Sequence, residues 1–448
     1  MSGLLIYFDE SQRRDLIREE IDGIYEPFSD ALSVRDWEFG KTIIALMAFS
    51  ESTIDYISLA KKGRRVATSK FRVEFSGMVN LESISIQSVE SRLSNRIRPH
   101  FINASRGAGG LVPEKTWLAL IDAIRKERPQ QVADIDRLMS LRRYSGYSLD
   151  GHIAELFLQE REALGAALDI FSGSNKLRDS VLSQWAPPER ALSEVNEQNS
   201  TARLLESGGR SSSFLSGIPQ RFVQEESALQ HDLFNWPGMT PVHIAGTSVF
   251  SQGGRRLEVI YANRNSLEHT LGVDLIYYNE DYDSYVLVQY KLMHEESDQM
   301  CYRPDQQLSD EMARMGSIYQ SCQRKKTIQS HGEFRLNDDG FMFKLVPNRG
   351  LRPASGELIK GMYLLREYMA FLIGPNGPKG TKGAPLLTFD GAPRYLTNSE
   401  FAAAVRSGWI GTSGMQSRIV KDLVRQYYET GRSLLVARES KMPPVEEA

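Results

Sequence analysis

The spacing of hydrophobic and polar residues changes along the chain and predicts where strands and helices lie. In the first part, "RDLIREEIDGIYEPF" has apolar positions at helical spacing, while "RRVATSKFRVEFSGMVNLESISIQS" alternates as a strand pair does. From Pro113 to about Phe171, apolar residues recur every three or four positions, in "PEKTWLALIDAIRKE" and "HIAELFLQEREALGAALDIF". We therefore expect an N-terminal α+β region over residues 1–110 and a helical region over residues 111–185.

A polar stretch then interrupts the pattern between Ala186 and Gly217. Its sequence, "APPERALSEVNEQNSTARLLESGGRSSSFLSG", is rich in Ser, Gly, Glu and Asn and poor in large apolar residues. Such a composition is typical of a linker or loop. We assign residues 186–216 to this linker and expect the main break in the chain near residue 215.

Beyond the linker, the pattern predicts a helix, three strands, a second helix and a fourth strand. The first helix, "PQRFVQEESALQHDLFNW", should end before Pro237, because proline disfavours helical geometry in the residue before it. The strands follow as "RRLEVIYA", "VDLIYY" and "SYVLVQYKLM", the second helix as "RPDQQLSDEMARMGSIYQSC" and the fourth strand as "GFMFKLV". These elements define a mixed α+β core over residues 217–346.

The last part of the chain, residues 347–448, is expected to be a mainly helical extension of this core. Apolar stripes predict helices at "ELIKGMYLLREYMAFLI", "TNSEFAAAVRSG" and "SGMQSRIVKDLVRQYYETG". A short final strand, "SLLVA", follows them.

Three polar residues stand within the apolar strands of the core. Asp274 opens "VDLIYY", and Gln289 and Lys291 lie inside "SYVLVQYKLM". Because a strand has a period of two, Gln289 and Lys291 point to one face, and Val288 and Tyr290 point to the other. A carboxylate, an amide and an ammonium group on an apolar hairpin indicate either a packing compromise or a functional site.

The order of elements, with an aspartate opening the second strand and (E/Q)-x-K in the third, resembles the PD-(D/E)XK nuclease superfamily. Asp274 matches the family's aspartate, and Gln289 and Lys291 match its paired positions. The resemblance covers roughly residues 216–346 and implies a restriction endonuclease-like α-β-β-β-α-β core. The chain departs from the family pattern in having no proline before Asp274 and a glutamine where an acid is commoner.

The family commonly takes one more glutamate from the helix before the sheet. The phrase "VQEESALQHD" offers Glu225 and Glu226. We prefer Glu226, because Leu229 and Leu233 follow it three and seven residues later and keep it beside the core-facing stripe. Glu225 is a secondary candidate, as is Glu268 in "NSLEHTLGVD".

The resemblance implies a metal-dependent endonuclease acting on DNA in preference to RNA. Hydrolysis of a phosphodiester needs an activated water and neutralised phosphate charge, and Mg²⁺ or Mn²⁺ held by oxygen ligands supplies both. The implied ligands are Asp274, Gln289, Glu226 and the main-chain carbonyl of Tyr290. Lys291 would orient or help to deprotonate the water, or stabilise the pentavalent phosphate. The implied setting is restriction, anti-phage defence or repair.

The same residues have other interpretations. Asp274 can cap a turn, and Gln289 and Lys291 can form the solvent-facing side of an edge strand, where lysine opposes strand-to-strand aggregation. A second functional hypothesis is a nucleic-acid-binding or assembly protein that keeps the nuclease scaffold without cutting, because Gln289 replaces the acid. A third is an RNA nuclease.

Basic residues gather at further places that suit contact with a phosphate backbone. The phrase "KKGRRVATSKFR" is an expected hairpin, or else a charged surface turn, with Lys61, Lys62, Arg64, Arg65, Lys70 and Arg72. Further candidates are Arg264, and Lys379 and Lys382 in "GPNGPKGTKGAP". If the hairpin binds nucleic acid, the N-terminal region would dock substrate, sense a trigger, bind a partner or restrain the nuclease.

Composition narrows the class of protein. A net charge of −3 argues against a histone-like packaging protein but permits a locally basic groove. Two cysteines are too few for a disulfide framework, so a reducing, cytoplasmic setting is expected. The chain start has no signal-peptide pattern, and the most apolar window carries Lys360, Arg366 and Glu367, so no membrane span is expected. A homo-oligomer, or a partner that activates or restrains the nuclease, is compatible with this interpretation.

Overall fold

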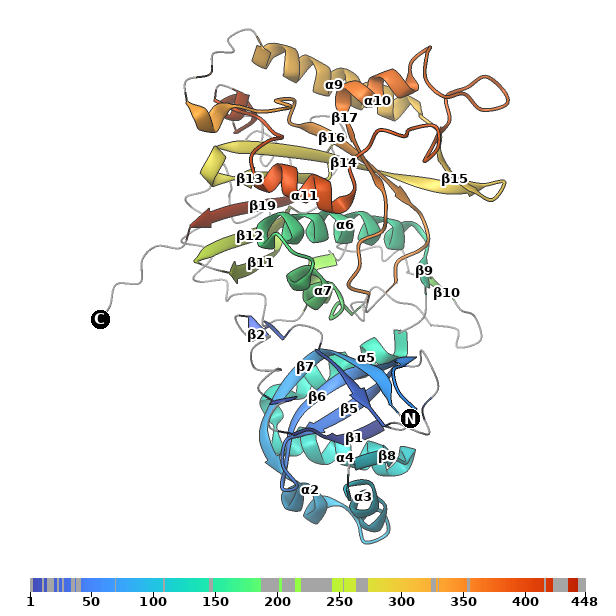
Figure 1. The fold of residues 1–448 in the computed structure, drawn as a ribbon, viewed down its shortest axis with the longest axis vertical. Helices are drawn as coiled ribbons and strands as arrows, with labels where there is room; N and C mark the ends of the chain where they lie inside the picture. The colour runs from blue at the N-terminus through green and yellow to red at the C-terminus, as the bar shows by residue number, and fades with distance from the viewer. Residues whose placement is uncertain are drawn as a thin grey trace, which may run out of the picture. The chain divides into compact units, whose positions relative to one another are not determined.

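The computed structural model forms two compact units (Figure 1). It describes residues 3–9, 12–13, 20–21, 24–25, 28–33, 37, 42–68, 70–107, 109–144, 148–186, 201–203, 214–218, 244–252, 254–262, 273–323, 328, 330–352, 355–414, 416–421 and 434–441. The first unit takes Met1–Tyr147, Asp179–Ala186 and Arg352–Gly356, and the second takes Ser148–Arg178, Pro187–Leu351 and Glu357–Ala448. The first change of unit thus falls between Tyr147 and Ser148, inside the region interpreted above as one helical segment.

The first unit is built on a six-stranded mixed sheet with the order β4-β7-β6-β5-β1-β8. Strands β1 and β5 are parallel, and the other neighbours are antiparallel. The hairpin predicted at "KKGRRVATSKFR" is confirmed by β6 and β7, but most of the predicted strand pair that begins at Arg64 is the single long strand β7. The strands are β1 (Gly3–Tyr7), β4 (Phe28–Leu32), β5 (Thr42–Ala48), β6 (Thr53–Arg65), β7 (Phe71–Ser85) and β8 (Gly109–Val112), and β2 (Glu20–Ile21) pairs separately with β3 (Ile24–Tyr25).

The helix predicted over "RDLIREEIDGIYEPF" is wrong where the structure describes that segment. Its described part contains β2, β3 and the start of β4. Phe28 lies opposite Phe75 of β7 and is buried with it. Pairing with β7 therefore overrides the helical spacing of the apolar residues.

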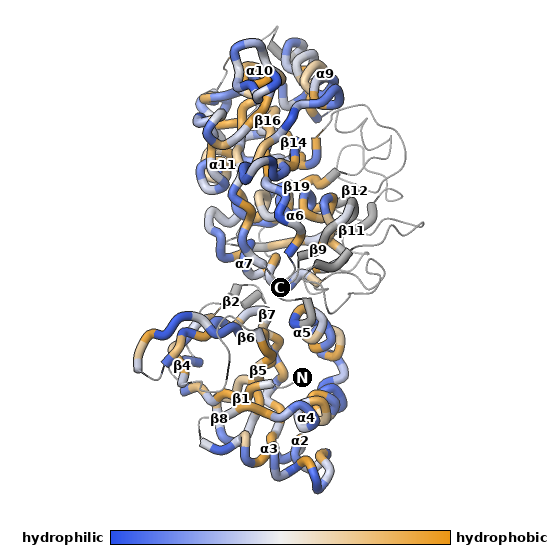
Figure 2. The backbone as a smooth tube through the Cα atoms, turned by 90° about the vertical axis from the view of Figure 1, so that its right-hand side faces the viewer, coloured by the Kyte–Doolittle hydropathy of each residue, from blue (hydrophilic) through white to orange (hydrophobic). Residues whose placement is uncertain are grey.

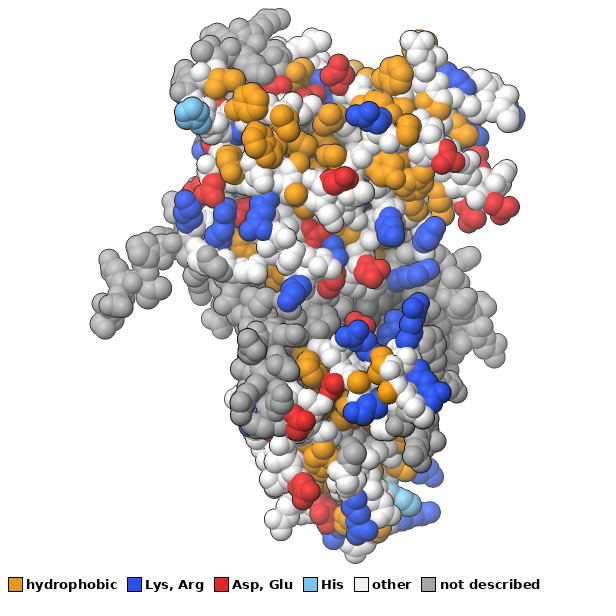
Figure 3. All heavy atoms as spheres, viewed as in Figure 1, with side chains coloured by type: hydrophobic (Ala, Val, Ile, Leu, Met, Phe, Trp, Pro, Cys, Tyr) orange, Lys and Arg blue, Asp and Glu red, His pale blue; other side chains and the backbone are white. Residues whose placement is uncertain are grey.

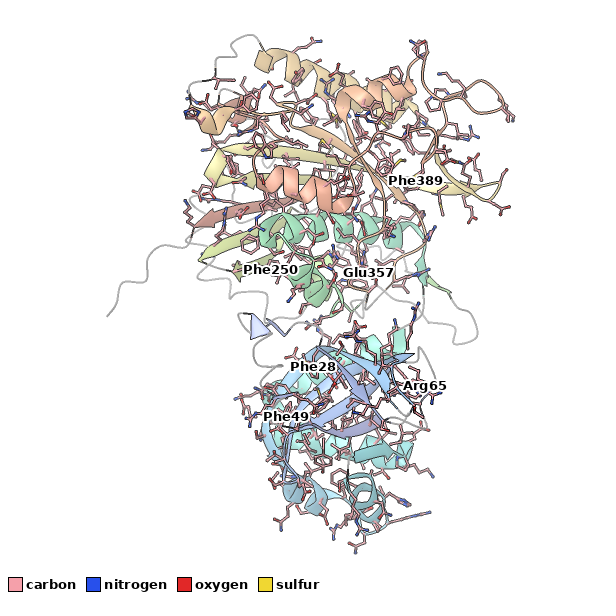
Figure 4. All side chains as sticks on the ribbon, viewed as in Figure 1. Phe28, Phe49, Arg65, Phe250, Glu357 and Phe389 are labelled. Atoms are coloured by element: carbon pink, nitrogen blue, oxygen red, sulfur yellow. The ribbon has the colours of Figure 1, made fainter. Side chains whose placement is uncertain are left out.

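The sheet of the first unit is buried on both faces, which explains the continuous apolar run of β1. Leu5 packs with Trp117 and Leu120 of α4, while Leu4 and Ile6 point to the opposite, aromatic-rich core. Figure 2 shows the hydrophobic stretches at the centre of this unit, and Figure 4 labels Phe28 and Phe49 of the aromatic side. The helices are α2 (Ile86–Arg92), α3 (Arg98–Ala104), α4 (Glu114–Glu127) and α5 (Val132–Tyr144).

The second unit contains a nine-stranded mixed sheet. Its main path is β11-β12-β19-β13-β14-β15-β18, and β16 pairs with both β14 and β17. A small parallel pair joins β9 (Ser148–Asp150) to β10 (Thr201–Arg203). The nine strands are β11 (Ile244–Gln252), β12 (Arg255–Ala262), β13 (Leu275–Asn279), β14 (Ser284–Glu296), β15 (Gln299–Tyr302), β16 (Phe341–Pro347), β17 (Met362–Leu365), β18 (Leu387–Thr388) and β19 (Leu434–Lys441).

The centre of this sheet combines a hairpin with a parallel crossover. Strands β13 and β14 are antiparallel, and α9 (Gln306–Gln323) lies in the connection from β14 to the parallel strand β16. The predicted elements β12, β13, β14, α9 and β16 are confirmed. The final strand was predicted, but its position was not: β19 lies between β12 and β13, antiparallel to the first and parallel to the second.

Helices cover both faces of the sheet in the second unit (Figures 1 and 2). One face packs against α9 and α10 (Arg366–Ile373), through a core that joins Leu308 and Met369 to Leu287 and Phe343. The other face meets α6 (His152–Ser172), from which Glu162 reaches Lys344 of β16. This layering confirms the mixed α+β class. None of the helices in the described part of the chain is both long and apolar enough to cross a membrane.

The helix predicted over "ELIKGMYLLREYMAFLI" is wrong in its first half. Met362–Leu365 form β17, and α10 begins only at Arg366. A short apolar run suits a buried strand as well as a helix, and pairing of Tyr363 with Lys344 decides for the strand. The other helices of the extension are α11 (Asn398–Arg406) and the described residues 416–421.

Alanine substitutions at two nearby glycines are expected to lower the free energy of unfolding by different amounts. Gly107 and Gly109 both have positive φ, but a Cβ on Gly107 meets nothing within 4 Å, whereas one on Gly109 would lie 2.1 Å from the carbonyl oxygen of Leu5. We expect Gly107→Ala to lower the free energy of unfolding by about 1–2 kcal/mol, the cost of the left-handed conformation. Gly109→Ala should cost clearly more, because β1 must also move. Urea unfolding of both variants checks this, and equal losses would contradict it.

Candidate active site

The main chain holds Asp274 between two neighbouring strands. Its N–H donates to the carbonyl of Val288 at 2.9 Å, and its carbonyl accepts the N–H of Leu435 at 3.1 Å. The carboxylate oxygen Oδ2 accepts the N–H of Tyr290 at 2.7 Å. Asp274 is therefore fixed at the mouth of β13, where its partly exposed side chain reaches β14.

Gln289 and Lys291 lie in the interior of the sheet. They are 7% and 9% exposed; β14 pairs with β16 at both positions, and its pairing with β13 ends one residue earlier, at Val288. The alternative of a solvent-facing edge strand is therefore wrong. Leu275 pairs with Val288, so Asp274 and Gln289 are the next positions along the two strands.

The two side chains have different partners. Gln289 Nε2 donates to the carbonyl of Tyr290 at 3.3 Å, while Gln289 Oε1 is buried and has no hydrogen-bond partner among the described residues. Lys291 Nζ lies 2.7 Å from Oε2 of Glu311. A buried amide oxygen beside a buried ion pair is a polar cluster on a largely apolar face.

Sequence reasoning missed Glu311, which belongs to α9. It is only 2% exposed, and its Oε1 accepts a hydrogen bond from Gln307 Nε2 at 2.9 Å. The sequence did carry a signal: Glu311 lies between Leu308 and Met315, both buried in the core under the helix. Residues three positions before and four positions after Glu311 lie on the same face of the helix as Glu311. Glu311 therefore had to point toward the sheet.

Two tyrosines add to the electrostatics around these residues. Burial raises the pKa of Tyr290 well above its ordinary value, and its hydroxyl donates to the carbonyl of Glu162 at 3.4 Å on the α6 face. Burial also raises the pKa of Tyr302, and the negative charges of Asp305 and Glu311 add to the shift. Both hydroxyls therefore stay protonated near neutral pH.

The oxygen atoms of this cluster are of the kinds that bind a hard divalent cation. The donors are the carboxylates of Asp274 and Glu311, the side-chain oxygen of Gln289 and the carbonyl of Tyr290, which are the ligand types Mg²⁺ prefers. The unpartnered Gln289 Oε1 is the atom that a cation would satisfy most directly. Among the described residues, no group of three or more His, Cys, Asp and Glu side chains could hold a metal ion.

Four other residues proposed from the sequence cannot be placed relative to this cluster. Glu225, Glu226, Glu268 and Arg264 lie outside the residues that the structure describes. They stay predictions.

The basic hairpin of the first unit is formed by β6 and β7. Lys62 differs from the prediction: it is buried, donates from Nζ to the carbonyl of Trp37 at 2.5 Å, and lies 3.9 Å from the ring centroid of Phe71. Strand alternation turns it inward, so its charge is not presented to a phosphate backbone. The exposed members are Lys61, Arg64, Arg65, Lys70 and Arg72.

Two of the remaining basic candidates donate hydrogen bonds to main-chain carbonyls nearby. The guanidinium of Arg65, labelled in Figure 4, donates to the carbonyls of Ala67 and Thr68 and so braces the hairpin turn. Lys379 and Lys382 are exposed, and Nζ of Lys379 donates to the carbonyl of Gly374 at 2.7 Å.

A separate cavity of about 680 Å³ lies at the turn end of the β13–β14 hairpin, away from Asp274. Tyr282, Phe334 and Trp409 line it, and the last two form an edge-to-face pair. Figure 3 shows hydrophobic side chains gathered on the visible face of the second unit. The sequence did not reveal this cavity, because its aromatic residues come from distant segments.

Comparisons with known proteins give no relative: no family model, no curated protein and no solved structure matches the chain. The class of protein is therefore argued from the fold and the Asp274–Gln289–Lys291 cluster alone.

The Lys291–Glu311 pair predicts a stability pattern that a surface pair would not give. Glu311→Leu leaves the Lys291 ammonium buried without its counter-charge and should lower the free energy of unfolding by about 3 kcal/mol. Adding Lys291→Met should restore most of that loss. Denaturant unfolding of both single variants and the double variant measures the coupling.

The exposed pair of Arg303 and Glu296 provides the control. Glu296→Gln should change stability little, because solvent screens that pair. Additive losses in the Lys291–Glu311 cycle would contradict a buried ionic contact.

Proposed function

We propose that this chain is a metal-dependent nuclease that hydrolyses phosphodiester bonds in DNA. The observation that carries the proposal is the placement of Asp274, Gln289 and Lys291 at the centre of one sheet, with Glu311 against Lys291. Lys291 is buried, and Asp274, Gln289 and Glu311 add oxygen donors to the same, otherwise largely apolar face. These groups suit a reaction that must hold a cation and stabilise phosphate charge.

The topology supports a restriction endonuclease-like core for this activity. An antiparallel hairpin carries the candidate residues, and α9 lies in the connection to the parallel strand β16. This matches the order that the resemblance implies for the second and third strands, the helix and the fourth strand. The insertion of β19 between β12 and β13 is a departure that the proposal must accommodate.

The proposed mechanism assigns a role to each residue of the cluster. Asp274, Gln289, Glu311 and the Tyr290 carbonyl would hold Mg²⁺ or Mn²⁺, which when bound supplies an activated water and neutralises phosphate charge. The N–H of Tyr290 keeps the Asp274 carboxylate in place. Lys291, oriented by Glu311, would donate a hydrogen bond to the water or to a phosphate oxygen. Glu226 stays a further proposed ligand.

A second candidate is a nucleic-acid-binding or assembly protein on the same scaffold. The observation that favours it is the close Lys291–Glu311 pair, in which two charges needed for catalysis neutralise each other. In either case the proposed setting is cytoplasmic, in restriction, anti-phage defence or repair. Regulation would come from the first unit, a partner protein or self-association.

A cleavage assay tests the nuclease proposal. We expect the protein to cut plasmid or linear duplex DNA with Mg²⁺ or Mn²⁺ and not with EDTA, and to cut RNA less. Asp274→Asn and Lys291→Met should each lower the rate by on the order of 100-fold or more, because each removes a group needed in the transition state. Asp283→Asn, at the exposed turn of the same hairpin, is the matched control and should leave the rate unchanged.

Each other outcome has a distinct meaning. Cutting that survives both site substitutions would show that another site or a contaminant is responsible. A folded wild-type protein that binds duplex but never cuts would favour the scaffold hypothesis. Faster cutting of RNA would keep the chemistry and change the substrate.

We propose further that the basic hairpin docks the nucleic acid. Lys70 lies just before β7 and Arg72 lies on it, and both are exposed. Glu74, an acidic residue close to them in the chain, lies opposite Lys61 on the neighbouring strand. The hairpin thus carries a net positive charge along one ribbon. The affinity of such a surface for a polyanion falls as salt rises.

Charge removal on the hairpin should change this salt dependence. Lys70→Gln with Arg72→Gln should weaken duplex binding and lower the slope of log affinity against log salt by roughly 1.8, or about 0.9 per lost contact. Lys115→Gln with Lys126→Gln removes the same charge from exposed positions on α4 and should change the slope less. Equal slopes for the two double variants would exclude a specific role for the hairpin.

A further inference from the structure

A fully buried ion pair lies behind the candidate active site. Nζ of Lys344 and Oε2 of Glu162 are 2.7 Å apart, and both side chains are 0% exposed. The other carboxylate oxygen of Glu162 lies 2.7 Å from the Arg161 guanidinium and accepts the N–H of Ile359 at 3.1 Å. Moving both charges out of water is costly, and apolar residues of similar size are often at least as stable. Stability alone therefore gives a weak reason for this pair.

Both residues of the pair lie next to the side chain of Tyr290 on the α6 face of the sheet. Lys344 is the register partner of Tyr290 on the neighbouring strand β16, and its Nζ lies 5.7 Å from the Tyr290 ring centroid. The Tyr290 hydroxyl donates to the main-chain carbonyl of Glu162 at 3.4 Å. The ring is thereby held between the helix and the sheet.

The main chain of the same residue belongs to the candidate site. The Tyr290 N–H donates to Asp274 Oδ2 at 2.7 Å, and its carbonyl accepts from Gln289 Nε2 at 3.3 Å. Tyr290 therefore connects the two faces: its side chain lies in the buried charge cluster, and its peptide groups orient two proposed metal ligands.

The Lys344 side chain stays charged near neutral pH. Burial by itself lowers the pKa of Lys344, but its interactions with Glu162 and Tyr363 outweigh that effect, so the pKa lies above its ordinary value. The positive charge of Lys344 is thus a constant part of the fold over the pH range in which a nuclease would act.

We propose that Glu162 and Lys344 are positioning residues that fix the main chain of Tyr290 and, through it, Asp274 and Gln289. They touch neither the substrate nor the metal ion. The expected effect on metal binding rests on the proposed function. The restraint on Tyr290 does not depend on that function.

A second buried polar contact in the same sheet provides a matched comparison. The Tyr277 hydroxyl donates to Glu439 Oε2 at 2.6 Å, and both side chains are fully buried. Tyr277 lies in β13, three residues from Asp274, yet neither of its peptide groups bonds a side chain of the site in the described structure. Tyr277→Phe therefore disturbs a comparable buried interaction without the proposed link to the site.

The test measures Tyr290 and metal affinity together. Glu162→Gln/Lys344→Met removes both charges of this pair at nearly constant volume; Arg161 loses the Glu162 carboxylate but keeps its hydrogen bond to the carbonyl of Glu357. We expect faster hydrogen exchange at the Tyr290 amide, with Leu287 and Phe343 unchanged, and Mn²⁺ affinity lowered by about 10-fold or more, as for groups that orient metal ligands. Tyr277→Phe should leave both quantities as in the wild type.

A second variant covers the case in which the double variant does not fold. Tyr290→Phe keeps the ring and the peptide groups and loses the contacts of the hydroxyl with the Glu162 carbonyl and with Tyr363. It should shift Tyr290 exchange and Mn²⁺ affinity in the same direction, by a smaller factor.

The outcomes separate this inference from the proposed function. Unchanged Tyr290 exchange and Mn²⁺ affinity in these variants would overturn the positioning role, as would equal effects of Tyr277→Phe. A wild-type protein that binds no Mn²⁺ would refute the metal-dependent function. Hydrogen exchange at Tyr290 would then decide the positioning role by itself.

Discussion

The pairing of β13 with β14 is the constraint on which the candidate site depends. The N–H of Tyr290 binds the Asp274 carboxylate only in the register that sets Leu275 opposite Val288. Because side chains alternate along a strand, a slip of one residue would turn Gln289 and Lys291 to the α6 face. The hairpin register therefore decides whether a carboxylate, an amide and an ammonium group share one face of the sheet.

The helices on the two faces reinforce this register through buried charges. On one face, α9 places Glu311 against Lys291; on the other, α6 places Glu162 against Lys344. Each ion pair joins a helix to a central strand at or next to Tyr290. Because unpaired buried charges are strongly unfavourable, each pair disfavours packings that separate its partners. Buried charges on both faces of the sheet thus help to fix the geometry of the main chain around Tyr290.

Local periodicity was enough to predict the hairpin, α9 and β16, and the shared face of Gln289 and Lys291. It could not place β19 beside β13, because that contact joins residues such as Leu275 and Leu435, which are remote in sequence. The strand β17 was missed because a short apolar run is ambiguous between helix and strand. Spacing within α9 indicates that Glu311 faces the sheet, but it does not reveal Lys291 as its partner, and the partner of Glu162 likewise lies in another element.

Anomalous scattering from crystals soaked in Mn²⁺ tests the central claim most directly. The account predicts one strong peak beside Asp274, with the Gln289 side-chain oxygen and the Tyr290 carbonyl within about 2.2 Å of the ion, a distance typical of small divalent cations. A peak at another place, or none at Mn²⁺ concentrations that saturate binding in solution, would contradict a metal centre at the mouth of β13.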